Sequence, residues 1–187
     1  KLFSNYATLG FGNYARIVGE LFITEQLSRS DYVGGMLRHH SSQGGIEELI
    51  LDDKFYNTSL DVTYGSQQRN FNWTADLGYQ HQVYNWYGLP MDFGSTLSAS
   101  DRNNLIGSID SKHAYNGISL GGKIEFYDSV FREISMKYSH FADSFDSSEN
   151  RFYVKPSLKF DVSEQTVKTD IIVDYVGGTF QKNYENT

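Results

Sequence analysis

The chain contains no cysteine and only two prolines among its 187 residues. The lack of cysteine excludes disulfide bridges, thiolate metal sites and thiol nucleophiles. The scarcity of proline leaves long stretches whose backbone N–H groups can all join a β-ladder. Long hydrophobic runs are also missing, since none approaches the roughly 18 apolar residues of a membrane helix. Transmembrane strands alternate polar and apolar residues and carry no such run, so a membrane location stays open.

Positive charge is scarce as well. The chain has 16 Lys and Arg residues against 23 Asp and Glu residues, which gives a net charge of -7. A nucleic-acid-binding surface needs clustered cations that neutralise phosphates, whereas the basic residues here are scattered singly. We therefore expect no nucleic-acid partner.

Alternation of polar and apolar residues is the clearest positive signal, and it is cleanest from Phe71 to Gln80. Every odd residue of this segment is apolar or aromatic, and every even residue is polar or glycine. Successive side chains of a strand point to opposite faces, so the segment has one apolar and one polar face. It is also long enough to span a membrane, because about 9–11 tilted residues cross the bilayer hydrocarbon.

Similar patterns recur along the chain and predict an antiparallel, all-β protein. The connections between the expected strands alternate from Asp31 onward. Short ones lie at 26–31, 66–70, 128–132 and 163–166, and long ones at 42–57, 84–112 and 142–150. In an up-and-down sheet this places all short turns at one end, which is typical of outer-membrane β-barrels. The expected strands are 4–11, 13–25, 31–41, 57–65, 70–84, 113–127, 133–141, 150–162 and 166–178.

We therefore predict an up-and-down transmembrane β-barrel in which residues 1–187 form a single region of about nine or ten strands. Single-chain bacterial barrels close with an even number of strands, and an odd open sheet would leave unpaired edges in lipid. The region is thus expected to be an arc of a larger barrel. An additional short strand or helical turn around Leu105, Ile106 and Ile109 is an alternative within the longest loop.

The alternation assigns side chains to the two faces of the predicted wall. The expected lumen-facing residues are Asn72, Thr74, Asp76, Gln80, Ser119, Lys123, Glu125, Arg151, Lys155 and Lys159. Aromatic residues near strand ends are expected to form girdles at the membrane interfaces. These are Phe71, Trp73, Tyr79, Phe126, Tyr127, Phe152, Phe160 and Tyr175. The alternative is that they pack the core of a soluble sandwich.

Three further aromatic residues, Tyr84, Trp86 and Tyr87, follow a predicted strand and lie in the longest loop. Aromatic rings in this position can stack on a sugar or a peptide, so they are candidate ligand contacts. The alternative is that they pack the loop against its neighbours.

No residue pattern predicts catalysis, a cofactor or a metal site. His39 and His40 are adjacent in a predicted strand, so their side chains point to opposite faces. No serine lies in a nucleophile elbow, and the glycine pairs lack the lysine and helix of a phosphate-binding loop. We expect a protein that is not an enzyme. A group of loop carboxylates without the calcium-loop pattern is expected to be solvated surface charge, namely Glu47, Glu48, Asp52 and Asp53.

Several segments resemble β-barrel sequences of Bacteroidota outer-membrane proteins of the TonB-dependent receptor-like group. The resemblance implies a barrel in the bacterial outer membrane that takes part in ligand uptake. Neither the plug domain nor the energy-coupling box of that group is seen in residues 1–187, so active transport is not implied. The segments that carry the resemblance are 5–14, 38–44, 84–88 and 149–156.

The leading hypothesis is therefore an integral outer-membrane protein for solute uptake or ligand transport, with lipid as its surroundings. One alternative is a scaffold barrel that docks other outer-membrane or periplasmic subunits. A second is a secreted, soluble β-sandwich that binds glycans through its loop aromatics.

Overall fold

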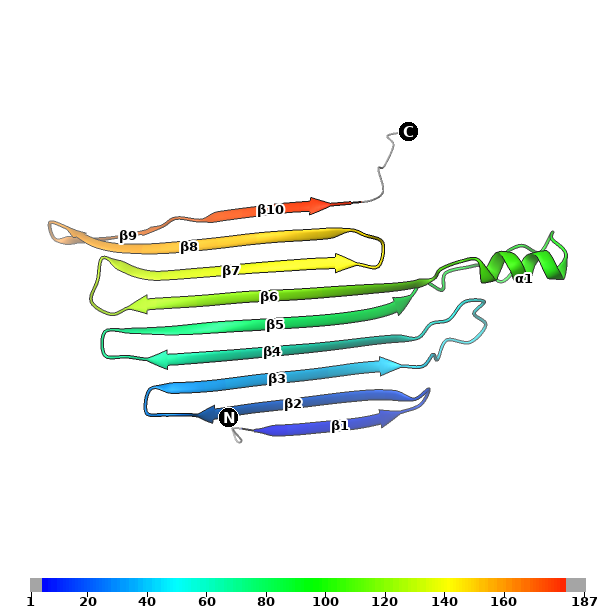
Figure 1. Ribbon diagram of the computed structural model, residues 1–187, viewed down its shortest axis with the longest axis horizontal. Helices are drawn as coiled ribbons and strands as arrows, with labels where there is room; N and C mark the ends of the chain where they lie inside the picture. Colours follow the sequence, from blue (N-terminus) through cyan, green and yellow to red (C-terminus); the bar gives the residue numbers. More distant parts are fainter. Residues whose placement is uncertain (1–4, 181–187) are drawn as a thin grey trace.

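The computed structural model describes residues 5–180, which form one antiparallel sheet and one short helix. The strands lie side by side in chain order (Figure 1). They are β1 (Tyr6–Gly12), β2 (Arg16–Gln26), β3 (Asp31–Ser42), β4 (Phe55–Gln67), β5 (Phe71–Asn85), β6 (Lys112–Phe126), β7 (Phe131–Asp143), β8 (Ser148–Val162), β9 (Gln165–Asp170) and β10 (Val173–Thr179).

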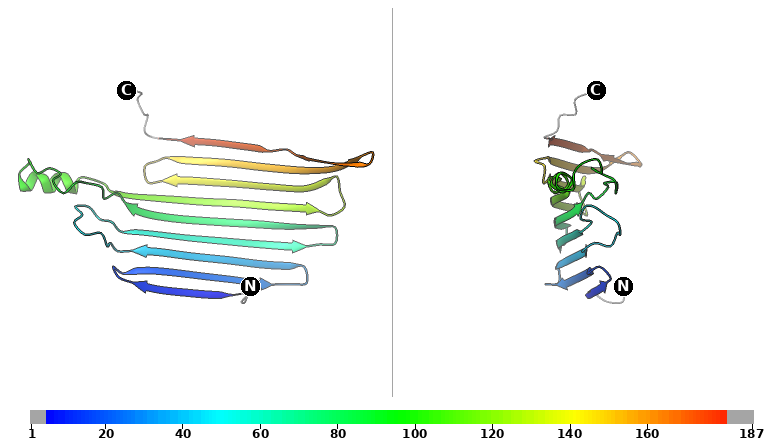
Figure 2. Two further views of the ribbon diagram at one scale, coloured as in Figure 1. Left: turned by 180° about the vertical axis from the view of Figure 1, so that it is seen from behind. Right: turned by 90° about the vertical axis from the view of Figure 1, so that its right-hand side faces the viewer.

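The sheet is an up-and-down meander in which each strand from β1 to β7 pairs with the next, and both β9 and β10 pair with β8. Viewed edge-on it is a single layer (Figure 2). It is not closed into a barrel, because β1 at one edge and β10 at the other do not pair. The prediction of an all-β, antiparallel, up-and-down sheet is confirmed in residues 5–180. The expected start of the first strand at residue 4 lies outside this range.

The last expected strand, 166–178, is divided into β9 and β10 at Ile171 and Ile172. The two pieces share one register against β8, with Asp170 opposite Ser157 and Val173 opposite Val154. The division lies at Pro156, which accepts a hydrogen bond from the Ile171 N–H (3.0 Å). Proline has no N–H to return that bond, so the ladder is interrupted there.

The connections differ between the two ends of the sheet. One end carries only short turns, 27–30, 68–70, 127–130 and 163–164, whereas the other carries the long loops 43–54 and 86–111 together with the short turns 13–15 and 144–147 (Figure 1). The expected long loop at 142–150 is wrong, because only residues 144–147 separate β7 from β8. Asp143 closes this tight turn by accepting hydrogen bonds from the N–H groups of Phe145 and Ser147, both at 2.8 Å.

The longest loop contains the helix α1 (Ala99–Gly107), so the helical alternative for this segment is confirmed. Ser98 caps α1 by accepting a hydrogen bond from the Asp101 N–H (3.2 Å). The loop does not disturb the strand order, since β5 and β6 pair from Phe71 opposite Phe126 to Asn85 opposite Lys112. In the described part of the chain, no helix has the length and apolar content needed to cross a membrane.

The sheet has almost no hydrophobic core. Within residues 5–180, Val83 is the only buried hydrophobic residue, at 4% exposure. Large apolar side chains such as Leu77 and Leu120 remain 40% and 54% exposed. Burial of apolar surface is the main force that stabilises folded proteins, and residues 5–180 bury little of theirs.

Candidate functional site: the two faces of the sheet

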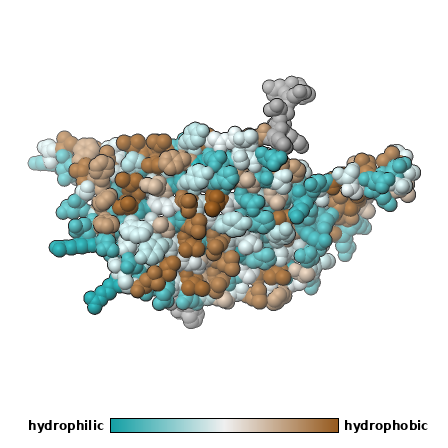
Figure 3. Space-filling model, viewed as in Figure 1, coloured by the Kyte–Doolittle hydropathy of each residue, from teal (hydrophilic) through white to brown (hydrophobic). Residues whose placement is uncertain are grey.

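One face of the sheet carries a continuous band of apolar side chains, here called the apolar belt. Residues opposite one another in the register share a face, and Leu77 lies between Val62 and Leu120. On β5 the belt extends from Phe71 to Tyr79. Hydrophobic residues run across the middle of the strands in the space-filling view (Figure 3). The same row continues from Leu120 through Tyr138 and Phe152 to Tyr175.

The apolar belt ends at a row of polar side chains near the long loops. His39 shares a hydrogen bond with Thr58 (2.8 Å), and on the next strands His81 shares one with Asn116 (2.7 Å). These four residues are in register on β3 to β6. The polar groups thus satisfy one another on the apolar face, where unpaired polar groups would be costly in an apolar medium.

His40 lies on the opposite face, as the sequence predicts from its position next to His39. Its Nε2 accepts a hydrogen bond from the Arg16 Nε (3.0 Å). Among residues 5–180, no three His, Asp or Glu side chains are grouped closely enough to hold a metal ion.

Most of the predicted interface aromatics lie on the apolar face. Phe71 and Phe126 are opposite one another, with ring centroids 6.2 Å apart. Tyr127 differs, because it follows the end of β6 and accepts a hydrogen bond from the polar-face residue Asn72 (3.1 Å). The residues that share the apolar face are Phe71, Trp73, Tyr79, Phe126, Phe152, Phe160 and Tyr175.

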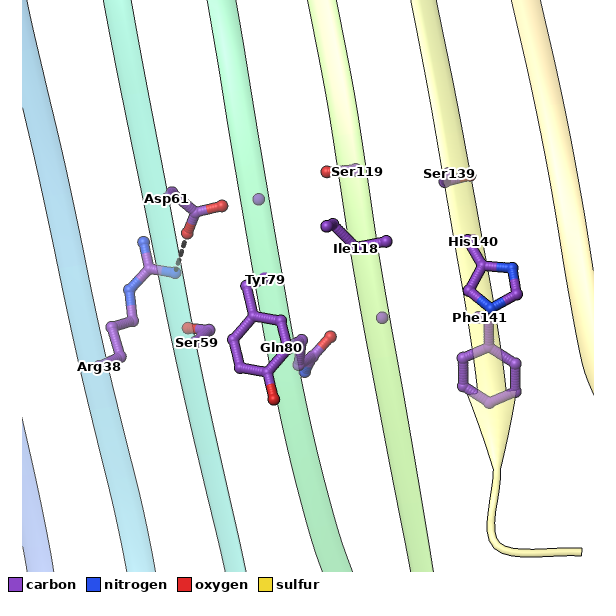
Figure 4. A pocket seen from close by; sticks show the side chains of 12 residues that line it. Arg38, Ser59, Asp61, Tyr79, Gln80, Ile118, Ser119, Ser139, His140 and Phe141 are labelled. Atoms are coloured by element: carbon purple, nitrogen blue, oxygen red, sulfur yellow. Dashed lines mark ion pairs between the residues drawn. The ribbon is translucent and has the colours of Figure 1, made fainter.

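The other face is polar, and its centre is hollowed into a shallow trough. Gly78, Gly117 and Gly121 have no side chains above the strands, and two adjoining hollows of 380 and 350 Å³ lie there. Arg38 and Asp61 form an ion pair (3.6 Å) at one wall of this central trough (Figure 4). All residues predicted to face a lumen lie on this face, which are Asn72, Thr74, Asp76, Gln80, Ser119, Lys123, Glu125, Arg151, Lys155 and Lys159.

Ion pairs between neighbouring strands neutralise part of the charge of the polar face. Examples are Lys123 with Glu133 (2.9 Å) and Lys155 with Asp170 (3.1 Å). Lys137 and Lys159, on the same face, make no ion pair within residues 5–180. These exposed pairs fix the side chains across the strands but stabilise the sheet only slightly.

An aromatic stack occupies the long-loop end of the polar face. The rings of Trp86 and His113 are stacked with centroids 4.1 Å apart, and those of Tyr84 and Tyr115 with centroids 5.3 Å apart. The Tyr84 hydroxyl donates a hydrogen bond to the Tyr115 hydroxyl (2.9 Å). Phe145 packs against His113 at 4.5 Å, and Phe141 against Tyr115 at 5.5 Å. Two of the three predicted loop aromatics, Tyr84 and Trp86, are therefore brought together, although the prediction that Tyr84 lies in the loop is wrong, because it belongs to β5 and pairs with His113.

The third loop aromatic, Tyr87, lines two cavities next to this stack. One, of 770 Å³, lies between Tyr87, Tyr14 and Phe55. The other, of 580 Å³, lies beside Trp86 and under Leu51 and Leu89. Trp86 is 61% exposed, so one of its faces is open to a ligand. These rings thus take part in loop packing, and contact with a ligand stays a prediction.

Four members of the aromatic stack were not predicted from the sequence, namely His113, Tyr115, Phe141 and Phe145. Alternation places His113 and Tyr115 on the polar face. Only the register of β5 against β6, with Tyr84 opposite His113, shows that they meet the loop aromatics.

The acidic loop is arranged by local contacts. Lys54 forms an ion pair with Asp52 (2.8 Å) and lowers the pKa of that carboxyl group. Asp53 accepts a hydrogen bond from the Ile46 N–H (2.9 Å).

A comparison of the chain with family models, curated proteins and solved structures finds no match. The resemblance to TonB-dependent receptor-like barrels therefore stays a prediction, and the function has to be argued from the two faces.

Proposed function

We propose that the sheet is part of the wall of a β-barrel in a bacterial outer membrane, with the apolar belt against lipid. The observation that supports this most strongly is the single-layer sheet with apolar side chains on one face and almost no core. A soluble sheet covers its apolar face with a second layer. In a membrane, lipid chains take that place.

The width of the apolar belt agrees with this proposal. From Phe71 to Tyr79 the chain rises by about 26 Å along the strand. At the tilt of about 40° found in membrane barrels, this corresponds to a height of about 20 Å, close to the apolar band of about 25 Å in such proteins. The row that contains His39 and His81 then lies at the boundary with the lipid headgroups.

The open edges of the sheet require further strands. The outer sides of β1 and of β9 and β10 present backbone N–H and C=O groups that pair with nothing in residues 5–180. Lipid cannot satisfy these groups, and closed barrels are the form in which sheets cross membranes. The proposal therefore includes additional strands at both edges.

The function we propose is capture and passage of a solute. The aromatic stack with its open Trp86 face lies at the mouth formed by the long loops, where a sugar or peptide can stack. From the aromatic stack, the solute would pass along the polar face through the central trough. Its charged side chains are placed to select among solutes.

A second candidate is a scaffold subunit, which is favoured by the loop that contains α1. This loop extends well beyond the end of the sheet (Figure 1). Such a projection can dock another outer-membrane or periplasmic protein. A barrel of this kind would be filled and would carry no current.

The glycan-binding sandwich is the weakest candidate. Residues 5–180 form one sheet and not two facing sheets, so a sandwich would need its second layer from another chain. A sandwich protein would be released from cells into buffer without detergent.

The experiment is fractionation followed by electrophysiology on the full protein. Retention in the outer-membrane fraction after an alkaline carbonate wash is expected, as is ion current in planar bilayers. Recovery in the soluble fraction would overturn the membrane assignment. Retention without current would favour the scaffold candidate over transport.

A further inference from the structure

The central trough has carboxylates on one wall and lysines on the other. Asp61 and Asp76 come from β4 and β5, whereas Lys123 and Lys137 come from β6 and β7. Of these four, Asp61 and Lys123 are held in the ion pairs with Arg38 and Glu133. The remaining two, Asp76 and Lys137, make no ion pair within residues 5–180 and can each meet a charged group of a ligand.

Asp76 and Lys137 lie in one row, separated only by Gly121. Gly121 is directly opposite Asp76 on one side and Lys137 on the other. Because neighbouring strands are about 4.8 Å apart, the backbones of the two charged residues are separated by about 10 Å, and the flexible Lys137 side chain sets the distance between the charges. Gly121 adds no side chain between them, and the Asp76 carboxylate reaches toward this position, with Oδ2 at 3.7 Å from where a Cβ would be. The Asp76 carboxylate is oriented by the Thr63 hydroxyl, which donates to it at 2.6 Å.

We propose that the trough binds a small zwitterion, with its ammonium group at Asp76 and its carboxylate at Lys137. A short peptide has this chemistry, since an extended tripeptide spans about 10 Å between its ends. The serine hydroxyls of Ser119 and Ser135 line the same hollow and supply hydrogen bonds between the two charges. The proposal rests on the transport function proposed above and specifies the class of solute.

The test is a titration of triglycine with the full protein folded in detergent. Binding is measured from the NMR signals of the peptide. The control ligand is the same peptide with an acetylated N-terminus and an amidated C-terminus, which carries no charge. Asp76→Asn and Lys137→Met are each expected to weaken triglycine binding about fivefold, the upper range for an exposed charge pair. Lys159→Met, which removes a lysine from the same face outside the trough, is the matched control and should leave binding unchanged.

Two further variants make the test specific to geometry. Exchange of the charges in the double variant Asp76→Lys, Lys137→Asp should retain binding, because the peptide can reverse its direction. Gly121→Leu should abolish binding by filling the trough. A Cβ at this position meets only ordinary contacts, the nearest being Asp76 Cβ at 3.5 Å, so the backbone has room for the first atom of the new side chain. Gly10→Leu on β1 is the corresponding control, with 3.9 Å to the Val18 carbonyl oxygen.

Equal binding of triglycine and the capped peptide would overturn the zwitterion site, as would unchanged binding by Lys137→Met. These results are separable from failure of the transport proposal. Detergent binding needs no passage, so charge-selective binding by a protein that conducts no ions would contradict transport alone. Ion current without charge-selective binding would contradict the zwitterion site alone.

Discussion

Leu77 lies directly opposite Leu120 across β5 and β6, and about half of each residue remains exposed within residues 5–180. The residues before and after Leu77, Asp76 and Gly78, point to the polar face. The surroundings of this leucine pair therefore distinguish a lipid-facing wall from a water-facing sheet.

Replacement of Leu77 by arginine is expected to destabilise the protein by about 2–4 kcal/mol if this position faces the middle of the bilayer. Thr74→Arg and Asp76→Arg, on the polar face, should cost much less. The measurement is urea unfolding from phospholipid vesicles, followed by tryptophan fluorescence. Equal costs at the three positions would contradict the assignment of the faces.

Gly65→Ala tests the close approach of Tyr32 to the strand beside it. The Tyr32 ring lies over Gly65, where a Cβ would overlap with Tyr32 Cζ. We expect a loss of about 1–3 kcal/mol, the usual cost of overpacking, and partial recovery in the double variant with Tyr32→Ala. Gly10→Ala in β1 has room for its Cβ and should change the free energy of unfolding by less than about 0.5 kcal/mol. If Gly65→Ala lowers the free energy of unfolding by the same amount when Tyr32 is alanine, the contact between Tyr32 and Gly65 is refuted.

Pro156→Ala tests why β9 and β10 are separate. Alanine supplies the missing N–H, which can donate to the Ile171 carbonyl oxygen and complete the ladder. A typical hydrogen bond contributes about 0.5–1.5 kcal/mol, partly offset by the greater freedom of the unfolded chain. Amide hydrogen exchange should slow around residues 155–157 and 170–173. The control is Pro90→Ala in the long loop, which should leave exchange at residues 155–157 and 170–173 unaltered. Unaltered exchange at these residues in Pro156→Ala would mean that the interruption has another cause.

His113→Ala tests the aromatic stack. This side chain contacts Trp86, Tyr84 and Phe145, and aromatic pairs contribute about 0.5–1.5 kcal/mol each. We expect a loss of about 1–3 kcal/mol and a red shift of Trp86 emission, measured with Trp73 replaced by phenylalanine. His140→Ala, on the opposite face, should not move the emission. An unshifted spectrum for His113→Ala would mean that Trp86 does not stack there.

The strands could be predicted because alternation is a local property. Phe71 to Gln80 alone shows the period, the two faces and the length of β5. The tight turn between β7 and β8 could not be predicted, since it depends on Asp143 capturing the N–H groups of Phe145 and Ser147. Long and short connections look alike in sequence when both are rich in serine and aspartate.

The sites depend on which strands become neighbours and in which register. Tyr84 and His113 are separated by the long loop that contains α1, so nothing local indicates that their rings meet. Asp76 and Lys137 are likewise joined only by the pairing of β5, β6 and β7. Charge and aromatic content were visible in the sequence, whereas their grouping appears only once the sheet is assembled.

Both surfaces of the sheet are built from alternate residues of the same strands, and this limits how the chain can change during evolution. Deletion of a single residue within β5 would move every later side chain of that strand to the wrong surface. Insertions and deletions are therefore tolerable in the long loops. Within a strand they are tolerable only in steps of two residues. Relatives of this chain should vary in loop size while the spacing within each strand stays constant.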